Sequence, residues 1–243
     1  MKLFAFSSRT AKEILRDPLT VGFGLGFPVV LLLLLSAIQA NIPVELFEIA
    51  HLTPGIAAFG LSFMTLFSAL LIAKDRGSAL LHRLYTTPMN ARDFILGYTL
   101  PMIPIAILQT IICYLLAMIL GLPWSPQLLF ALMAAIPNAW LYISLGLLFG
   151  SLLNDKQVGG ICGAILTNLS AWLSGTWFDL ELVGGAFRKI AYCLPFVHAV
   201  ELTRAAQSGA WSDVLPHLWW VFGYGLAVTG GAVALFLRQM RRV

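Results

Sequence analysis

The sequence predicts an all-α membrane protein that crosses the bilayer six times. Hydrophobic residues form 59% of the chain and charged residues only 11%, whereas charged residues make up roughly a quarter of a typical soluble domain. The hydrophobic residues are collected in runs of about 20, the length that an α-helix needs to cross the hydrocarbon core. The 243 residues therefore predict one transmembrane domain, residues 1–243, with short connections.

Residues 1–17 predict a helix that lies in the membrane surface. On a helical wheel the basic residues form one stripe and apolar residues lie opposite, as in an interfacial helix. The stripe is Lys2, Arg9, Lys12 and Arg16, and the opposite side holds Leu3, Phe4, Ala11, Ile14 and Leu15. Pro18 ends the helix, because the residue before a proline avoids the helical region. The alternative is a charged flank that only fixes the orientation of the chain.

Six apolar runs follow this helix, and each is expected to form one span. Their approximate limits are 19–38, 54–73, 99–120, 128–153, 157–178 and 217–237. We expect Pro28 to kink the first span, because its ring removes a backbone donor. Small residues at the start of the fifth span, Gly159, Gly160 and Gly163, predict a close approach to another helix.

The connection between the second and third spans, residues 74–98, is the longest charged segment between two apolar runs. It contains a short stretch that ends at Pro88 and that has four apolar residues on one helical face, which predicts a helix docked on a partner. These four residues are Leu80, Leu81, Leu84 and Tyr85.

The connection between the fifth and sixth spans, residues 179–216, is rich in apolar residues. We expect two short helices, 183–194 and 198–206, separated by a break at Pro195. Irregular backbone at membrane depth must be buried in protein, so this pair is expected to dip part-way into the outer leaflet. Glu201 and Arg204 are three positions apart and are expected to form a local ion pair.

The distribution of basic residues predicts the orientation. All but three of the 15 Lys and Arg residues fall on one side of the expected membrane, and the exceptions are Arg188, Lys189 and Arg204. Cytoplasmic connections carry the excess of Lys and Arg. Both termini and residues 74–98 are therefore expected in the cytoplasm and residues 179–216 outside. The net charge of +4 follows from this topology, so we expect no nucleic-acid partner.

The expected spans lack the residues that ion-driven carriers and membrane enzymes require. They have no Asp, Glu, Lys or Arg between their ends, and their amides are Gln109, Asn138 and Asn168. The chain has no phosphate-binding G-x-x-x-x-G-K-[ST] loop. Its histidines, His51, His82, His198 and His217, fall in different connections. We therefore expect no catalytic site and no bound cofactor or metal, and an energy source outside this chain.

Three stretches resemble the permease subunits of type-2 ABC exporters, in the same order along the chain. The first is Ile14 to Pro18, followed by Pro28. The second comprises Asp75-Arg76, Arg83-Leu84, Thr87-Pro88-Met89 and Asp93 to Tyr98. The third is Leu194-Pro195-Phe196 with Val200-Glu201-Leu202 and Arg204.

This resemblance implies an assembly in a bacterial or archaeal inner membrane. Two permease protomers, identical or merely similar, would pair among membrane lipids, and two copies of a separate ATPase subunit would bind ATP and magnesium. The helix in residues 74–98 would couple each permease to an ATPase. The implied ATPase-coupling residues are Asp75, Arg76, Gly77, Leu80, Leu81, Arg83, Leu84, Tyr85 and Pro88.

The resemblance also implies a substrate path between the protomers and a gate at the outer face. The path residues would be Phe59, Phe63 and Phe67 on the second span with Asn168 and Trp172 on the fifth. The outer gate would be Pro195, Glu201 and Arg204. An aromatic path without charge suits a hydrophobic or amphipathic substrate, such as a drug, a lipid or a peptide-like molecule, which would be exported.

Two other functions stay open at this point. The chain could be a membrane enzyme that modifies lipid, which the absence of buried acids, bases and metal ligands disfavours. It could also be a channel or scaffold that needs no ATP, and the amphipathic face of residues 80–85 argues against that function. On either reading Arg76 and Arg83 would be orientation charges alone.

Overall fold

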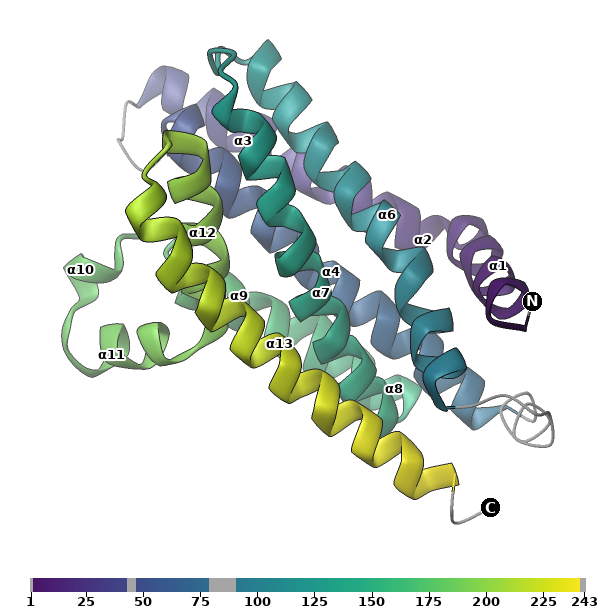
Figure 1. Ribbon diagram of the computed structural model, residues 1–243. Coiled ribbons are helices and arrows are strands. Elements are labelled where there is room, and N and C mark those ends of the chain that lie inside the picture. The colour runs from purple at the N-terminus through teal and green to yellow at the C-terminus, as the bar shows by residue number, and fades with distance from the viewer. Residues whose placement is uncertain (1, 43–46, 79–90, 241–243) are drawn as a thin grey trace.

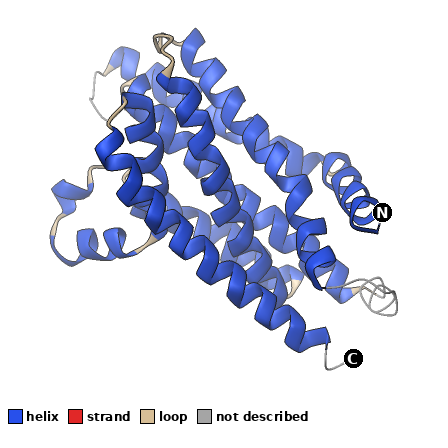
Figure 2. Ribbon diagram, viewed as in Figure 1, coloured by secondary structure: helices blue, strands red, loops and turns tan. Residues whose placement is uncertain are grey.

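A computed structural model describes residues 2–42, 47–78 and 91–240. Regular structure in this part of the chain is helical (Figure 2). Figure 1 shows the long helices side by side along one direction. Helix α1, the end of α4, the start of α6 and the end of α13 lie toward one end of the bundle, while α10 and α11 project on the side away from α1.

Five helical segments among the described residues are long and apolar enough to cross a membrane, and they correspond to the first, second, third, fourth and sixth predicted spans. The helices are α3 (Phe27–Asn41) with the π-helical turn η1 (Gly22–Gly26) before it, α4 (Ile49–Gly77), α6 (Ala91–Ile119), α7 (Gln127–Leu152) and α13 (Trp211–Met240). The π-helical turn η1 ends two residues before Pro28, which cannot donate a backbone hydrogen bond to the preceding turn.

The predicted fifth span consists of shorter pieces and is not among these five segments. A capping box at Asn154 begins α8 (Asp155–Val158), which is followed by π-helical η3 (Gly159–Leu166) and by α9 (Thr167–Leu173). The helix thus ends earlier than the predicted limit at residue 178. That this segment crosses the membrane stays a prediction.

The closest helix approach is made by α7 against α4, whereas the predicted fifth span approaches α4 less closely. A Cβ atom added at Gly150 would lie 2.8 Å from the backbone oxygen of Ala69, and one at Gly146 would lie 2.7 Å from that of Thr65. In the predicted fifth span, the same atom would lie 3.4 Å from the Leu66 side chain of α4 at Gly163, and at Gly159 and Gly160 it would meet nothing within 4 Å. Helix α4 is therefore the buried centre of the bundle, in contact with α3, α6, α7 and α12.

Helix α1 (Lys2–Arg16) packs on α6 through a buried stripe, and the short helix α2 (Pro18–Val21) follows it. Phe6, Thr10 and Ile14 are buried at successive turns, and the Phe6 ring packs edge-on against Tyr98 with centroids 5.0 Å apart. Phe4 remains 76% exposed. An exposed apolar residue on a docked helix is consistent with the predicted membrane-surface location, which stays a prediction.

The connection before α13 folds into three short helices. These are α10 (Leu180–Val183), α11 (Gly185–Cys193) and α12 (Pro195–Ser208). The break falls at Leu194, directly before Pro195, and Gly209 ends α12 in a left-handed conformation with φ of 77°. Helix α12 packs against α7 and α13, and its first turns are buried. Its depth in the outer leaflet stays a prediction.

Candidate functional site

The C-terminal end of α4 is fixed to α1 and α6 by a buried carboxylate. Asp75 is only 4% exposed. Its two oxygens accept hydrogen bonds from the Arg9 guanidinium at 2.6 and 3.0 Å, and one of them also accepts from the Tyr98 hydroxyl at 2.9 Å. Two-point Arg–carboxylate contacts are strong and fix orientation as well as distance. The contact with Asp75 raises the pKa of Arg9, so the guanidinium stays charged.

The next residue, Arg76, fixes the same end of α4 to α7. Its guanidinium donates to the backbone oxygen of Ser151 and, at 2.6 Å, to that of Leu153. These carbonyls belong to the last turn and C-cap of α7, which have no partners within the helix. Two consecutive side chains thus hold α4 on two sides, immediately before the connection that begins at residue 79.

The first two predicted ATPase-coupling residues, Asp75 and Arg76, bind other helices of this chain and so hold the end of α4 from which the connection departs. Their coupling role stays a prediction. Gly77 ends α4 and is exposed. The other six predicted coupling residues, Leu80, Leu81, Arg83, Leu84, Tyr85 and Pro88, lie outside the described residues, and their role stays a prediction.

The five predicted path residues do not line a common surface of this chain. Phe59, Phe63 and Phe67 are buried. The Phe63 ring contacts Phe27 of α3 at a centroid distance of 5.5 Å, so α3 covers the stripe. On α9, in contrast, Asn168 is exposed and Trp172 is 50% exposed. A path that uses both groups would need a movement or a second protomer, and this role stays a prediction.

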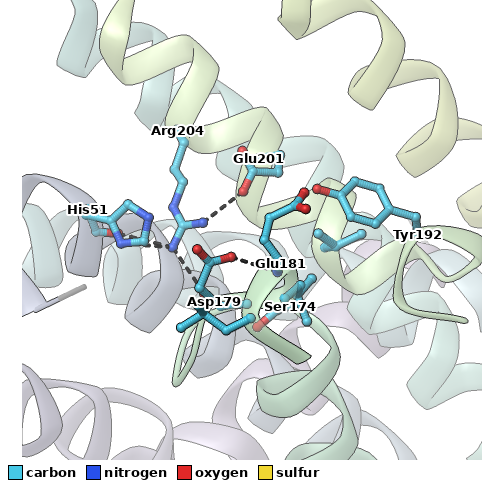
Figure 3. A pocket seen from close by; sticks show the side chains of 11 residues that line it. His51, Ser174, Asp179, Glu181, Tyr192, Glu201 and Arg204 are labelled. Carbon is cyan, nitrogen blue, oxygen red and sulfur yellow. Dashed lines mark hydrogen bonds and ion pairs between the residues drawn. The ribbon is translucent and has the colours of Figure 1, made fainter. Parts of the chain in front are cut away.

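A pocket of about 560 Å³ lies at the opposite end of α4, between its first turn and α10, α11 and α12 (Figure 3). Its lining combines carboxylates with a guanidinium, an imidazole and a phenol, together with small apolar side chains. The residues are His51, Ser174, Gly175, Asp179, Leu180, Glu181, Leu182, Tyr192, Val197, Glu201 and Arg204. The pocket includes two of the three predicted outer-gate residues.

Arg204 connects the separate walls of this pocket. It forms the predicted ion pair with Glu201 at 2.8 Å, and its other terminal nitrogen lies 3.4 Å from the backbone oxygens of both His51 and Gly175. Figure 3 shows the guanidinium between His51 and Glu201. Gln207, one turn further along α12, donates to the Ala50 oxygen at 2.7 Å. Pro195 is buried at the start of α12.

Sequence reasoning missed a histidine pair beside this pocket. His198 on α12 and His217 on α13 were expected to be separate, yet their Nδ1 atoms lie 2.9 Å apart. Their distance of 19 residues along the chain matches no helical spacing, so only the bend before α13 brings them together. Across the described ranges, no three His, Cys, Asp or Glu side chains are arranged to hold a metal ion.

These features define a helical membrane domain with several long apolar helices, fixed by polar contacts at one end and holding a pocket at the other. Comparison with known families adds the class of transporter: the family described as ABC-2 type transporter matches residues 1–208. This chain therefore belongs to the ABC-2 type transporter family, as the three resembling stretches predict. No match was found among curated proteins.

Proposed function

We propose that this chain is the permease subunit of an ATP-driven exporter and that α4 carries the movement between its two ends. The observation that supports this function is the position of α4. Its cytoplasmic end is held by Asp75 and Arg76, and its outer end meets α12 through Gln207 and Arg204. The helix has 29 residues and is about 43 Å long at about 1.5 Å per residue.

The proposed mechanism begins at an ATPase bound to residues 79–90. Closure of two ATPase subunits on ATP and magnesium would displace this connection in each of two paired permeases. Because Asp75 and Arg76 tie α4 to α1, α6 and α7, these helices would shift together as a rigid body. The shift at the outer end of α4 would then change the contacts of Arg204, which joins the pocket walls.

The proposed substrate is hydrophobic or amphipathic and leaves the cytoplasm. Its path would be apolar, since the described spans carry their charged groups at the ends, and the pocket beside Arg204 would be its exit. Charged side chains are costly within the hydrocarbon core, so an apolar substrate needs no compensating ion there. A drug, a lipid or a peptide-like molecule fits this description, and the permease itself would hydrolyse no ATP.

Co-purification tests the coupling. A tagged chain, isolated in detergent from the cells in which it occurs, is expected to retain an ATPase subunit at about one copy per permease, as the proposed rigid-body mechanism requires. Leu84→Asp places a charge on the predicted docking face and should remove both the subunit and the ATP hydrolysis. Val183→Asp introduces the same charge at an exposed site on α10 that does not line the pocket, and it should leave both unchanged.

Two results would contradict the proposed coupling. One is a wild-type chain that purifies without any ATPase, which would favour a channel or scaffold that needs no ATP. The other is an ATPase that remains bound, and equally active, in Leu84→Asp. Insertion of each variant into the membrane is checked first, so that loss of the partner is not confused with loss of the permease.

A further inference from the structure

The histidine pair connects the outer helices to the outer part of α13. His198 is 4% exposed and is enclosed by α11 and α13. Its Nε2 lies 3.0 Å from the backbone oxygen of Tyr192, and its ring stacks on Trp220 with centroids 4.7 Å apart and planes 7° apart. A second link lies nearby, where the Tyr224 hydroxyl donates to the Cys193 oxygen. The α11–α12 corner, residues 192–198, is thus held on α13 by the contacts of His198 with His217 and Trp220 and by the bond from Tyr224.

The hydrogen bonds assign the tautomers of both rings. A carbonyl oxygen only accepts, so His198 must carry a proton on Nε2 to bond Tyr192. The Nδ1 of neutral His198 is then an acceptor, and the proton in the contact with His217 belongs to His217 Nδ1. The bond between the two rings therefore needs one Nδ1 to remain unprotonated, and it is lost when both rings are protonated.

A first proton and a second proton have different effects on this pair. His217 can take up a proton on Nε2, the nitrogen that the pair does not use, and its Nδ1–H still points at His198. A proton on His198 Nδ1 places two N–H groups against each other at 2.9 Å and adds a like charge. The two titrations are coupled, and the second one breaks the contact.

The charged and polar groups that face the pair determine how readily its histidines are protonated. Glu201 on α12, which is paired with Arg204, and Asp213 on α13 favour a positive charge, as does the Tyr192 oxygen on α11. The Arg188 guanidinium on α11 lies over the Tyr192 ring, 5.6 Å from its centroid. From α7, the neutral Asn138 amide bonds the Ala199 oxygen. Burial has the largest effect and lowers the pKa of His198 below its ordinary value.

We propose that His198 and His217 form a pH-sensitive latch that holds the α11–α12 corner on α13 and releases it when His198 takes up the second proton of the pair, so that both rings are charged. Tyr192 and Val197 belong to this corner and line the outer pocket, so release would change the pocket wall. The latch is a property of this chain alone. Its regulation of export rests on the proposed function, and the compartment whose pH it senses rests on the predicted orientation.

The sign of the pH effect follows from the burial of His198. The folded chain binds this proton less readily than the unfolded chain, so the latch contributes fully to stability above the ordinary histidine pKa of about 6.5. Its contribution is lost as the pH falls from there toward the lower pKa of the folded state. Release is therefore expected in mildly acidic solution.

Fluorescence of the purified chain tests the protonation step. The chain has seven tryptophans, and the difference between wild type and Trp220→Phe isolates the emission of Trp220. An imidazolium quenches a stacked indole more strongly than a neutral imidazole. The Trp220 emission should therefore fall as the pH is lowered from about 8 to about 5, with a midpoint below that of a free histidine. His198→Gln should abolish this fall, and His217→Gln should move its midpoint to higher pH.

A thiol-linked fluorophore on Cys193 tests the release itself. Cys193 is exposed in the corner, whereas Cys113 and Cys162 are buried. Its emission should shift with the Trp220 midpoint and should not shift in His198→Gln. The latch is wrong if Trp220 does not titrate in this range, if His198→Gln titrates like wild type, or if Trp220 titrates while the Cys193 signal stays constant. If His198→Gln does not purify as a folded protein, an unshifted midpoint in His217→Gln overturns the proposal.

Discussion

At the scale of single residues, Asp75 shows why a charge next to a span can be structural. A carboxylate at the end of a long apolar helix can face either solvent or protein, and sequence spacing does not distinguish the two. The structure buries it against Arg9 and Tyr98, on two other helices. A charge that is removed from water remains favourable only when it is paired and hydrogen-bonded, so each of these contacts matters for folding.

Replacement of Asp75 by Asn should destabilise the protein. The amide keeps the shape of the side chain but removes the charge that Arg9 and Tyr98 both bind, and hydrogen bonds to charged groups contribute about 1.5–3 kcal/mol. Thermal unfolding in detergent should show a loss of that order. Glu13→Gln removes only the half-exposed partner of Arg9 and should cost less than about 1 kcal/mol. Equal unfolding temperatures for Asp75→Asn and wild type would contradict the assigned role.

The residue contacts that the sequence predicts are those along a single helix. Glu201 and Arg204 are three positions apart on α12, and their ion pair is found as expected. Arg9 and Asp75 are 66 positions apart, and the geometry that joins them depends on how α1 docks beneath α6. The contacts of Asp75 with other helices could not be predicted for this reason. The missed histidine pair has the same cause, because its members lie on different helices.

At the scale of elements, the packing of α4 on α7 depends on small residues. Gly146 and Gly150 lie one turn apart on α7 and face Thr65, Ser68 and Ala69 of α4. Small residues at this spacing let two helix backbones approach closely. In lipid the burial of apolar surface does not drive helices together, so the van der Waals contacts of such a close approach stabilise their association. The contact holds the centre of the proposed rigid body together.

Gly150→Ala should weaken this contact. Its new Cβ atom would lie 2.8 Å from a backbone oxygen and 2.9 Å from a Cα atom of Ala69, and backbone cannot move aside as a side-chain tip can. Overpacking of this kind typically costs about 1–3 kcal/mol. Gly230→Ala, on α13 with nothing within 4 Å of the added atom, should be neutral or stabilising by up to about 1 kcal/mol. Unfolding in detergent compares them, and equal stability of the two variants would contradict close packing at Gly150.

The elements most visible in the sequence are the uniform apolar runs. Five predicted spans match long apolar helices, because about 20 consecutive apolar residues have few alternatives in a membrane chain. The fifth run is less regular. Its first turns contain Gly159, Gly160 and Gly163, and the structure is π-helical there. Glycine lowers helix propensity and hydropathy together, so the limits of this segment could not be read from composition.

At the scale of the whole molecule, the structure separates two sites by the length of one helix. The C-terminal end of α4 carries the contacts of Asp75 and Arg76, and its N-terminal end borders the pocket of Arg204. Anchors at both ends of a buried helix allow a displacement at one end to be felt at the other, because a packed helix moves as a unit. This arrangement has a function only if the two ends face opposite sides of the membrane.

The orientation can be tested with the native thiols. The excess of basic residues at the end that carries α1 predicts that this end is cytoplasmic, and Cys193 is then extracytoplasmic. A membrane-impermeant maleimide should label exposed Cys193 in intact cells, and Cys193→Ser should remove that labelling. Lys156→Cys in the Cys193→Ser background places an exposed thiol at the opposite end, where labelling should require permeabilised cells. The reverse pattern would invert the protein in the membrane and move the proposed exit pocket to the cytoplasm, which would contradict export through it.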